Sequence, residues 1–260
     1  MRLYDGYLFD LDGTIYLGEE LIPGADLAVA SLRQRGARVL FLSNKPIARR
    51  ETYAEKLTRL GIPASADDVV NSPLASARYL SREHPGARVM VLGEAPLERE
   101  LLEAGVELTE RVEEAEIVLV SWDRQITYQQ LDAAHQALLR GARFFATNPD
   151  VVCPLEGGRT VPDSGANIAY LQASTGRQLE VLIGKPSPII TEMAMAQIGL
   201  QARQCLMVGD RLDTDMAMGE TAGLDTALVL TGVTSREDLE RSEREPTYVL
   251  HSVAELAEAL

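Results

Sequence analysis

Two acidic clusters follow short apolar runs and supply the residue types needed for metal-assisted chemistry. Asp10 and Asp12 come directly after the apolar run 7–9, and residues 209–215 place three more aspartates after the apolar run 205–208. Carboxylate oxygens with no nearby His or Cys, apart from Cys205 within the second run itself, suit a hard cation such as Mg²⁺ better than Zn²⁺. The sequence therefore predicts a divalent metal site built from aspartates.

The alternation of apolar runs and helical segments predicts how the two clusters are positioned. Continuous apolar runs are typical of parallel strands that helices cover on both faces. Many of the intervening helical segments stop at a glycine, for example Gly36 and Gly223, which favours the left-handed helix end. The apolar runs are residues 7–9, 39–42, 89–92, 117–120, 144–146, 181–183, 206–208 and 227–230. We expect an α/β protein whose site lies at the carboxyl ends of its strands.

Polar residues at two other predicted strand ends suit phosphate binding. Ser43, Asn44 and Lys45 follow the run 39–42, and Lys185 follows the run 181–183. A Walker loop is excluded because it needs a glycine five positions before Gly184, where the chain has Leu179. The dinucleotide fingerprint is excluded as well, since the chain contains no Gly-x-Gly.

The amino-acid composition limits which partners we expect the protein to bind and in which cellular compartment we expect it. The 260 residues carry 39 acidic and 25 basic side chains, a formal charge of -14, which predicts no binding of a nucleic acid polymer and no attraction to an anionic membrane surface. The N-terminal segment lacks the apolar core of a signal peptide, and no apolar run has membrane-spanning length. We expect a soluble cytoplasmic protein.

The cysteines and histidines show no pattern that suggests chemistry. Cys153 and Cys205 have neither metal-ligand spacing nor the pattern of a disulfide framework, and lone cysteines usually pack as small hydrophobes. The histidines at positions 84, 135 and 251 are scattered, and a histidine acts as base or ligand only with partners nearby.

The ordered set of motifs resembles the haloacid dehalogenase-like hydrolase superfamily. The matching motifs are Asp-Leu-Asp-Gly-Thr at 10–14, Ser43, Gly-Lys-Pro at 184–186, and Gly-Asp at 209–210 with Asp215. Only 32 residues separate Asp10 from Ser43, whereas 141 separate Ser43 from Lys185, so an additional domain must be inserted there. An insertion at this place is similar to the C2 cap.

The segments at 146–150 and 183–188 are similar to subfamily IIA, the branch with nucleotide, sugar, nitrophenyl and pyridoxal phosphate phosphatases. The resemblance implies a Rossmann-like parallel-sheet core with an inserted α/β cap of the C2 type. We expect the core at residues 1–84 and 181–260 and the cap at residues 85–180. The cap is also a candidate surface for a homodimer.

The resemblance implies a Mg²⁺-dependent phosphatase that hydrolyses a small-metabolite phosphomonoester through an aspartyl phosphate. Asp10 corresponds to the nucleophile, and Asp12 to the acid/base, with its backbone carbonyl on the metal. Asp10, Asp12 and Asp210 are the implied metal ligands, and Asp215 would position Lys185 or a metal-bound water from the second layer. Isolated Asp-x-Asp pairs usually form turns, and this is the alternative for the first motif.

The phosphate is expected to contact Ser43, the Asn44 amide, Lys45 and Lys185, and Lys185 would also bind the Asp10 carboxylate. Ser43 has an alternative role as a helix cap before a proline. Lys45 stands where the family often has an asparagine or another small polar residue, and an exposed lysine on a loop is its alternative.

Substrate choice is expected in the cap, at the loop 148–158, where Cys153 and the neighbouring valines suggest an apolar lining with Gly157 and Gly158 as a hinge. Trp122 could frame the cleft, form a subunit contact or pack on a strand end. The sequence does not distinguish sugar phosphate, nucleotide, phosphoglycolate or pyridoxal phosphate as the substrate.

Two other classes of function remain as alternatives. One is a phosphoacceptor signalling module with Asp123 as acceptor, although receiver domains are about half as long and have no place for the Asp210 cluster. The other is a catalytically inactive relative that binds a metabolite.

Overall fold

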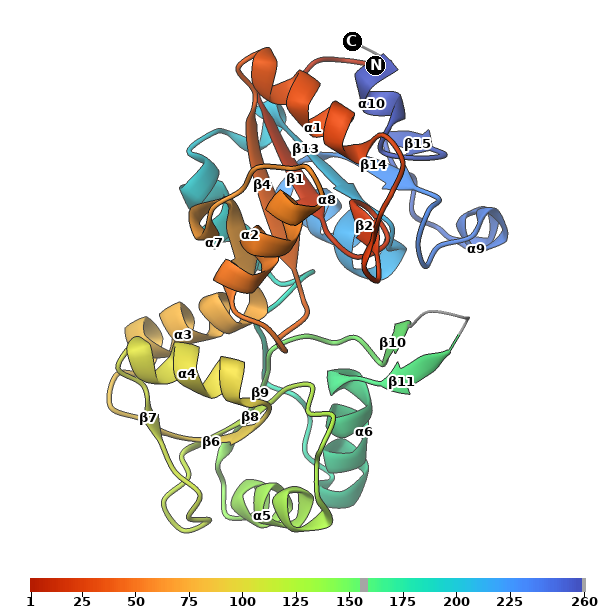
Figure 1. The fold of residues 1–260 in the computed structure, drawn as a ribbon. Coiled ribbons are helices and arrows are strands. Elements are labelled where there is room, and N and C mark those ends of the chain that lie inside the picture. Colours follow the sequence, from red (N-terminus) through yellow and green to blue (C-terminus); the bar gives the residue numbers. More distant parts are fainter. Residues whose placement is uncertain (155–158, 259–260) are drawn as a thin grey trace. The chain divides into compact units, whose positions relative to one another are not determined.

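The computed structural model describes residues 1–154 and 159–258, which divide into two compact units (Figure 1). The first unit comprises residues 1–43, 50–70 and 190–260, and the second comprises residues 44–49 and 71–189. Within the described residues, no helix has both the length and the hydrophobicity required to cross a membrane.

The first unit is built on a six-stranded sheet with strand order β15-β14-β13-β1-β4-β5. Its central strand β1 pairs in parallel with β4 and β13, and β13 and β14 continue the parallel pairing to β15. The strands of this sheet are β1 (Gly6–Asp10), β4 (Arg38–Ser43), β5 (Val69–Asn71), β13 (Cys205–Gly209), β14 (Asp225–Val229) and β15 (Tyr248–Leu250), and β2 (Tyr16–Leu17) and β3 (Glu20–Leu21) form a separate two-stranded sheet. The helices are α1 (Ala25–Gln34), α2 (Arg50–Arg59), α7 (Pro188–Ile198), α8 (Ala217–Ala222), α9 (Arg236–Arg241) and α10 (Glu255–Glu258).

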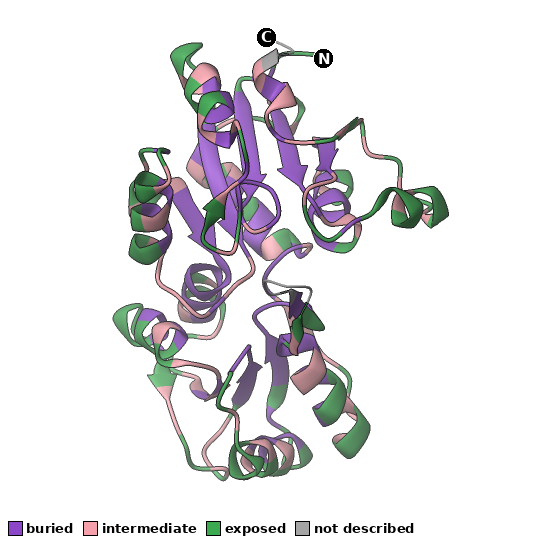
Figure 2. Ribbon diagram, turned by 45° about the vertical axis from the view of Figure 1, so that its right-hand side comes forward, coloured by how far each residue is buried: buried purple, intermediate pink, exposed green. Residues whose placement is uncertain are grey.

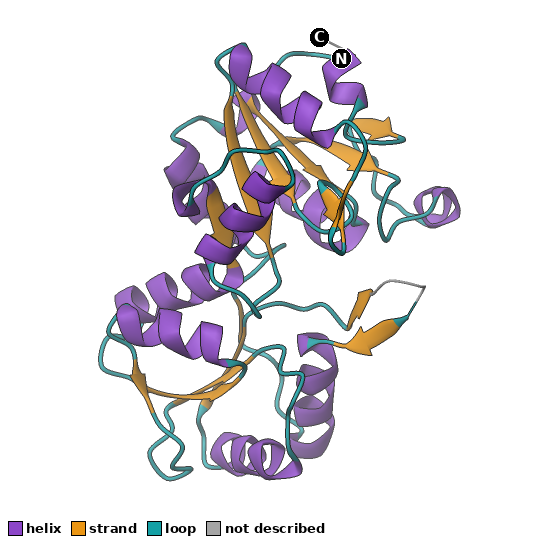
Figure 3. Cartoon of the chain, viewed as in Figure 1, coloured by secondary structure: helices purple, strands orange, loops and turns teal. Residues whose placement is uncertain are grey.

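The apolar sequence of β1 explains its central place. All five of its residues are buried, and helices flank the sheet on both faces (Figures 2 and 3). Asp10 at the end of β1 lies opposite Leu42 of β4, and Phe9 lies opposite Val208 of β13. The register therefore brings the carboxyl ends of β1, β4 and β13 to one edge, as the sequence predicts.

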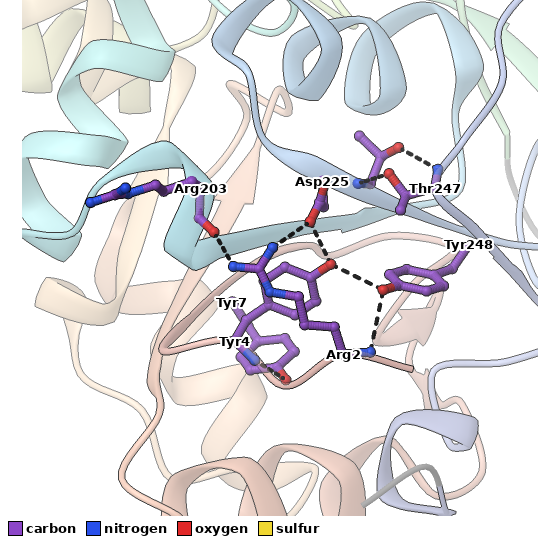
Figure 4. A network of polar contacts seen from close by, with 8 residues as sticks. Arg2, Tyr4, Tyr7, Arg203, Asp225, Thr247 and Tyr248 are labelled. Atoms are coloured by element: carbon purple, nitrogen blue, oxygen red, sulfur yellow. Dashed lines mark hydrogen bonds and ion pairs between the residues drawn. The ribbon is translucent and has the colours of Figure 1, made fainter.

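A polar network holds together the opposite, amino edge of this sheet (Figure 4). The Tyr4 hydroxyl donates to Asp225 Oδ2 at 2.7 Å and lies 3.2 Å from the Tyr248 hydroxyl. The Arg2 guanidinium donates to the Arg203 carbonyl at 2.8 Å. These residues precede or begin β1, β13, β14 and β15, so this edge is occupied by structural contacts.

The second unit contains a five-stranded parallel sheet with order β12-β9-β8-β6-β7. Its strands are β6 (Arg88–Leu92), β7 (Glu107–Leu108), β8 (Ile117–Val120), β9 (Arg143–Ala146) and β12 (Val181–Leu182), beside the hairpin of β10 (Val152–Pro154) and β11 (Thr160–Pro162). Its helices are α3 (Ser72–Glu83), α4 (Ala95–Glu103), α5 (Tyr128–Leu139) and α6 (Ser164–Thr175). Apolar residues of this sheet pack with those of α5 and α6 in one core.

The structure confirms an α/β fold with a Rossmann-like parallel-sheet core and an inserted α/β unit. We expected residues 181–183 to form a strand of the core, but β12 pairs with β9 in the second sheet. The second unit also includes α3, which lies before residue 85. The expected domain division at 85–180 stays a prediction.

Candidate active site

Three carboxylates converge at the carboxyl edge of the six-stranded sheet. Asp10 is the last residue of β1, Asp210 follows β13, and Asp215 lies in a π-helical turn, η4 (Leu212–Met216). One oxygen from each lies within 4.8 Å of the others, and all three residues are buried. The structure thus brings Asp215 into the same cluster as the two predicted metal ligands, although the sequence indicated only an indirect role for it.

A π-helical turn separates β13 from the helix that follows it. Asp213, Thr214 and Asp215 lie in this turn, and α8 starts at Ala217. This turn points Asp215 back toward the strand end, where Arg211 N–H donates to Asp215 Oδ2 at 3.2 Å.

Glycines make room for the buried carboxylates. A Cβ at Gly232 would lie 2.0 Å from Asp210 Oδ2, and a Cβ at Gly13 would lie 2.5 Å from the same oxygen. Gly13 also has a φ of +90, which other residues rarely adopt. A Cβ at Gly209 would lie 2.3 Å from Asp215 Cγ. Any side chain at these three positions would displace a carboxylate.

The surroundings of Asp210 leave its charge only partly compensated. Val233 N–H donates to Asp210 Oδ2 at 2.6 Å, whereas Oδ1 is buried and has no hydrogen-bond partner among the described residues. Burial, followed by the charges of Asp10 and Asp215, raises the pKa of Asp210 well above its usual range. A buried carboxylate oxygen without a partner is costly unless a cation or a proton satisfies it.

This donor set fits the Mg²⁺ that the family resemblance implies. Three carboxylates supply oxygen ligands only, and the unpartnered Asp210 oxygen provides an open coordinating atom. Asp10, Asp210 and Asp215 are the residues that would hold the ion. The Asp12 side chain is not one of the three, and its predicted backbone contact to the metal stays a prediction.

The second unit fixes the main chain of the predicted phosphate-binding lysine. Lys185 is only 2% exposed, and its N–H donates to Asn44 Oδ1 at 2.8 Å. Asn44 Nδ2 donates to the Lys185 carbonyl and to Asp150 Oδ2, both at 3.0 Å. Because these bonds use both hydrogens of Nδ2, a phosphate contact by Asn44 would have to use its main chain. Ser43, which ends β4, is buried.

Lys45 lies near an acidic group of the same unit. Its charge lowers the pKa of Asp163, although burial outweighs this and raises the pKa of Asp163 to about 6. Lys45 is half-buried. A contact from Lys45 to the substrate stays a prediction.

The expected specificity loop is partly a hairpin. Its described part contains β10, which pairs antiparallel with β11. Val151 and Val152 are 61% and 42% exposed, whereas Cys153 is buried. Residues 155–158, which include the expected hinge glycines 157 and 158, lie outside the described residues.

Trp122 and Asp123, for which the sequence left alternative roles open, make structural contacts. Trp122 is buried, as expected for an indole that packs on a strand end. Asp123 accepts hydrogen bonds from Gln125 N–H and Gln130 Nε2 at the start of α5.

The sequence did not reveal two supporting segments. Asn148, Asp150 and Asp163 form buried polar contacts in the second unit. The segment 146–150, which carries the subfamily resemblance, marked the first two residues but not their contacts. Residues 231–233 support Asp210, and the Thr-Gly pair directly after the apolar run 227–230 was the available signal.

Comparisons with known proteins identify the class and the family. Residues 7–107 and 182–256 match family models described as haloacid dehalogenase-like hydrolases. The chain is 40% identical over 255 residues to the 5'-nucleotidase YutF of Bacillus subtilis, covering 98% of both proteins. It is 39% identical over 260 residues to the acid sugar phosphatase of Staphylococcus saprophyticus, covering 100% of this chain and 99% of that protein.

A solved structure of p-nitrophenyl phosphatase from Archaeoglobus fulgidus covers 100% of both chains with a TM-score of 0.93 and 38% identity. These matches define a phosphoric monoester hydrolase. The chain belongs to the haloacid dehalogenase-like hydrolases, in subfamily IIA with the nitrophenyl phosphatases. The match over the whole chain decides against a receiver module.

Proposed function

We propose that this phosphatase is Mg²⁺-dependent and hydrolyses a small phosphorylated metabolite through a phosphoryl group carried on Asp10. The observation that supports this most strongly is the buried cluster of Asp10, Asp210 and Asp215 with one unpartnered carboxylate oxygen. When bound, Mg²⁺ would neutralise the repulsion between carboxylates and phosphate and orient the phosphoryl group.

The chemistry divides into two displacements. An Asp10 oxygen attacks phosphorus while the bond to the leaving oxygen breaks, and Asp12 donates a proton to that oxygen. Asp12 then accepts a proton from water, the water oxygen attacks phosphorus, and the bond to Asp10 breaks to release phosphate. Lys185 contributes positive charge to the phosphoryl oxygens throughout.

The relatives suggest the substrate class. Their names include a nucleotidase, a sugar phosphatase and a p-nitrophenyl phosphatase, so nucleotides and sugar phosphates are the first candidates. We propose that the second unit selects among them and leaves the phosphoryl chemistry unchanged.

The test is phosphate release over a panel of nucleoside monophosphates, sugar phosphates, phosphoglycolate and pyridoxal phosphate, with Mg²⁺ and with EDTA. We expect turnover that EDTA abolishes and Mg²⁺ restores. Asp10→Asn should be inactive but folded, whereas Asp123→Asn, a buried aspartate that accepts two hydrogen bonds, should retain activity. Turnover that survives chelation, or an active Asp10→Asn, would contradict the proposal.

A further inference from the structure

Hydrogen bonds from Asn44 fix the main chain on either side of the Lys185 Cα. The amide oxygen of Asn44 accepts from the Lys185 N–H, and its nitrogen donates to the Lys185 carbonyl. The remaining hydrogen of that nitrogen reaches Asp150 Oδ2 at 3.0 Å. Three hydrogen bonds therefore define the plane of the Asn44 amide, and this plane defines the position of Lys185.

Asp150 is held in turn by buried side chains. Asn148 Nδ2 donates to Asp150 Oδ2 at 2.9 Å and to Asp163 Oδ1 at 3.0 Å. Asp150 is 8% exposed, Asn148 is 1% exposed and Asp163 is 3% exposed. A buried network whose members satisfy one another is rigid, and loss of one member leaves costly unpaired groups.

The residue before Lys185 leaves little room for movement. Gly184 N–H donates to the Thr147 carbonyl at 2.8 Å. A Cβ at Gly184 would lie 2.4 Å from the Thr147 oxygen and 2.7 Å from Asn44 Oδ1. The chain that leads into Lys185 therefore lies in close contact with Thr147, directly after β9, and with Asn44.

We propose that Asp150 is a positioning residue for Lys185, which it controls by holding the Asn44 amide. One oxygen of Asp150 accepts from both Asn44 and Asn148, so its removal leaves an N–H group of the half-buried Asn44 and one of the buried Asn148 without that acceptor. The Asn44 amide would then rotate or shift, and Lys185 would move with it. The inference rests on the proposed role of Lys185 at the phosphoryl group.

The size and pattern of the effect follow from this geometry. A displacement of about 1 Å in a group that acts on the transition state costs up to about 100-fold in rate. Every substrate presents the same phosphoryl group to Lys185. Loss of Asp150 should therefore lower kcat/KM by a similar factor on all substrates, unlike a change in a surface that contacts only the leaving group.

The experiment is a double-mutant cycle with Asp150→Ala and Asn44→Ala. We would measure kcat and KM on p-nitrophenyl phosphate, a nucleoside monophosphate and a sugar phosphate. We expect Asp150→Ala to lower kcat/KM by about 10- to 100-fold on all three. The double variant should be no worse than the worse single variant, because both act through one contact. Asp150→Asn retains an oxygen acceptor and should recover part of the activity.

Asp123→Ala is the matched control. Asp123 is 9% exposed, lies in the same unit and also accepts two hydrogen bonds. We expect its kcat/KM to stay within about threefold of wild type, because the hydrogen bonds of Asp123 are to Gln125 and Gln130 and not to Asn44. Thermal unfolding of every variant separates lost activity from lost folding.

Lys185→Ala separates this inference from the proposed function. If Lys185→Ala retains turnover, the proposed role of Lys185 is wrong and the positioning role of Asp150 fails with it, whereas the Asp10→Asn and EDTA tests decide the proposed function. If Lys185→Ala is inactive, the behaviour of Asp150→Ala decides the positioning role. That role alone is wrong if Asp150→Ala has the kcat/KM of the Asp123→Ala control or loses activity on one substrate only. It is also wrong if its loss of kcat/KM adds to the loss caused by Asn44→Ala.

A second variant keeps the test decisive if Asp150→Ala does not fold. Asp150→Asn preserves the size of the side chain, but its neutral oxygen is a weaker acceptor for Asn44 and Asn148. An equal loss of kcat/KM on all three substrates that does not add to the loss of Asn44→Ala supports the positioning role. Wild-type kcat/KM, a loss on one substrate only, or a loss that adds to that of Asn44→Ala overturns it.

Discussion

The substitution Asp210→Asn should raise the Tm of the protein without Mg²⁺ and reduce the increase in Tm that Mg²⁺ produces. Three carboxylates lie within 4.8 Å of one another, so each ionised pair repels by at least about 3 kcal/mol at an effective dielectric constant of about 20. At a pH above the raised pKa of Asp210, where all three groups are ionised, the neutral amide removes two of these three pairs. Without metal, the variant should therefore unfold at a higher temperature than wild type.

With metal, the difference in stability should become smaller, because Mg²⁺ stabilises the wild-type protein more than the variant. Mg²⁺ at about 100 times its Kd stabilises the wild-type protein by about 2.7 kcal/mol. For a chain of this length, this corresponds to an increase in Tm of about 5 to 10 °C. A Kd about 30 times weaker, after loss of one anionic ligand, leaves only about 0.9 kcal/mol.

The assay is thermal unfolding in EDTA and across a Mg²⁺ titration. Asp225→Asn is the control, because Asp225 belongs to the structural network at the opposite edge of the same sheet (Figure 4). It should lower Tm in EDTA and keep the full increase with Mg²⁺. An Asp210→Asn variant with the wild-type increase, or with a lower Tm in EDTA, would refute the assignment of Asp210 to the metal.

Three further predictions address other parts of the structure. Gly232→Ala places a Cβ 2.0 Å from Asp210 Oδ2. The Mg²⁺ concentration for half-maximal activity should therefore rise by at least about tenfold, while the circular dichroism spectrum stays unchanged. Normal Mg²⁺ dependence would show that the carboxylate can move freely. Burial raises the pKa of Asp163 from 3.8 to about 6, so the folded state binds this proton more tightly than the unfolded state. Stability from this group should therefore fall by about 3 kcal/mol as pH rises from about 4 to about 6, and Asp163→Asn should flatten that part of the curve of unfolding free energy against pH. Val152, which is exposed, should contribute to substrate selection. Val152→Ala should change the ratio of kcat/KM between a nucleotide and a sugar phosphate by more than about threefold and should alter p-nitrophenyl phosphate hydrolysis less. An equal loss on all substrates would show that the hairpin has no role in substrate selection.

The sequence predicts most of the strands because each consists of a short, continuous run of apolar residues. All eight apolar runs coincide with strands, since a strand covered on both faces needs a continuous apolar segment. The sequence does not predict which sheet a run joins. Residues 181–183 have the composition of a core strand, but β12 pairs with β9. Pairing depends on contacts between distant segments, which composition does not encode.

The short strands show another limit. β10 and β11 lie in a segment rich in glycine and proline that the sequence favours as a loop. A hairpin of three-residue strands depends on cross-strand hydrogen bonds more than on residue preference.

The candidate site was predictable where each residue carries its own motif. Asp10 and Asp210 follow apolar runs, and a strand end places them without further information. The contact between Asn44 and Asp150 spans 106 residues of sequence, and the one between Asn44 and Lys185 spans 141. Such side-chain pairs are determined by the tertiary structure, so one sequence could not reveal them.

In the proposed reaction, Asp10 carries the phosphoryl group during turnover. The most direct test mixes enzyme, Mg²⁺ and p-nitrophenyl phosphate, stops the reaction with acid within one turnover, and locates the phosphoryl group by peptide mass spectrometry. We predict an aspartyl phosphate on Asp10 that is absent from Asp10→Asn and disappears as turnover completes. A phosphoryl group on another residue, or full turnover with no adduct at any time point, would show that Asp10 is not the nucleophile.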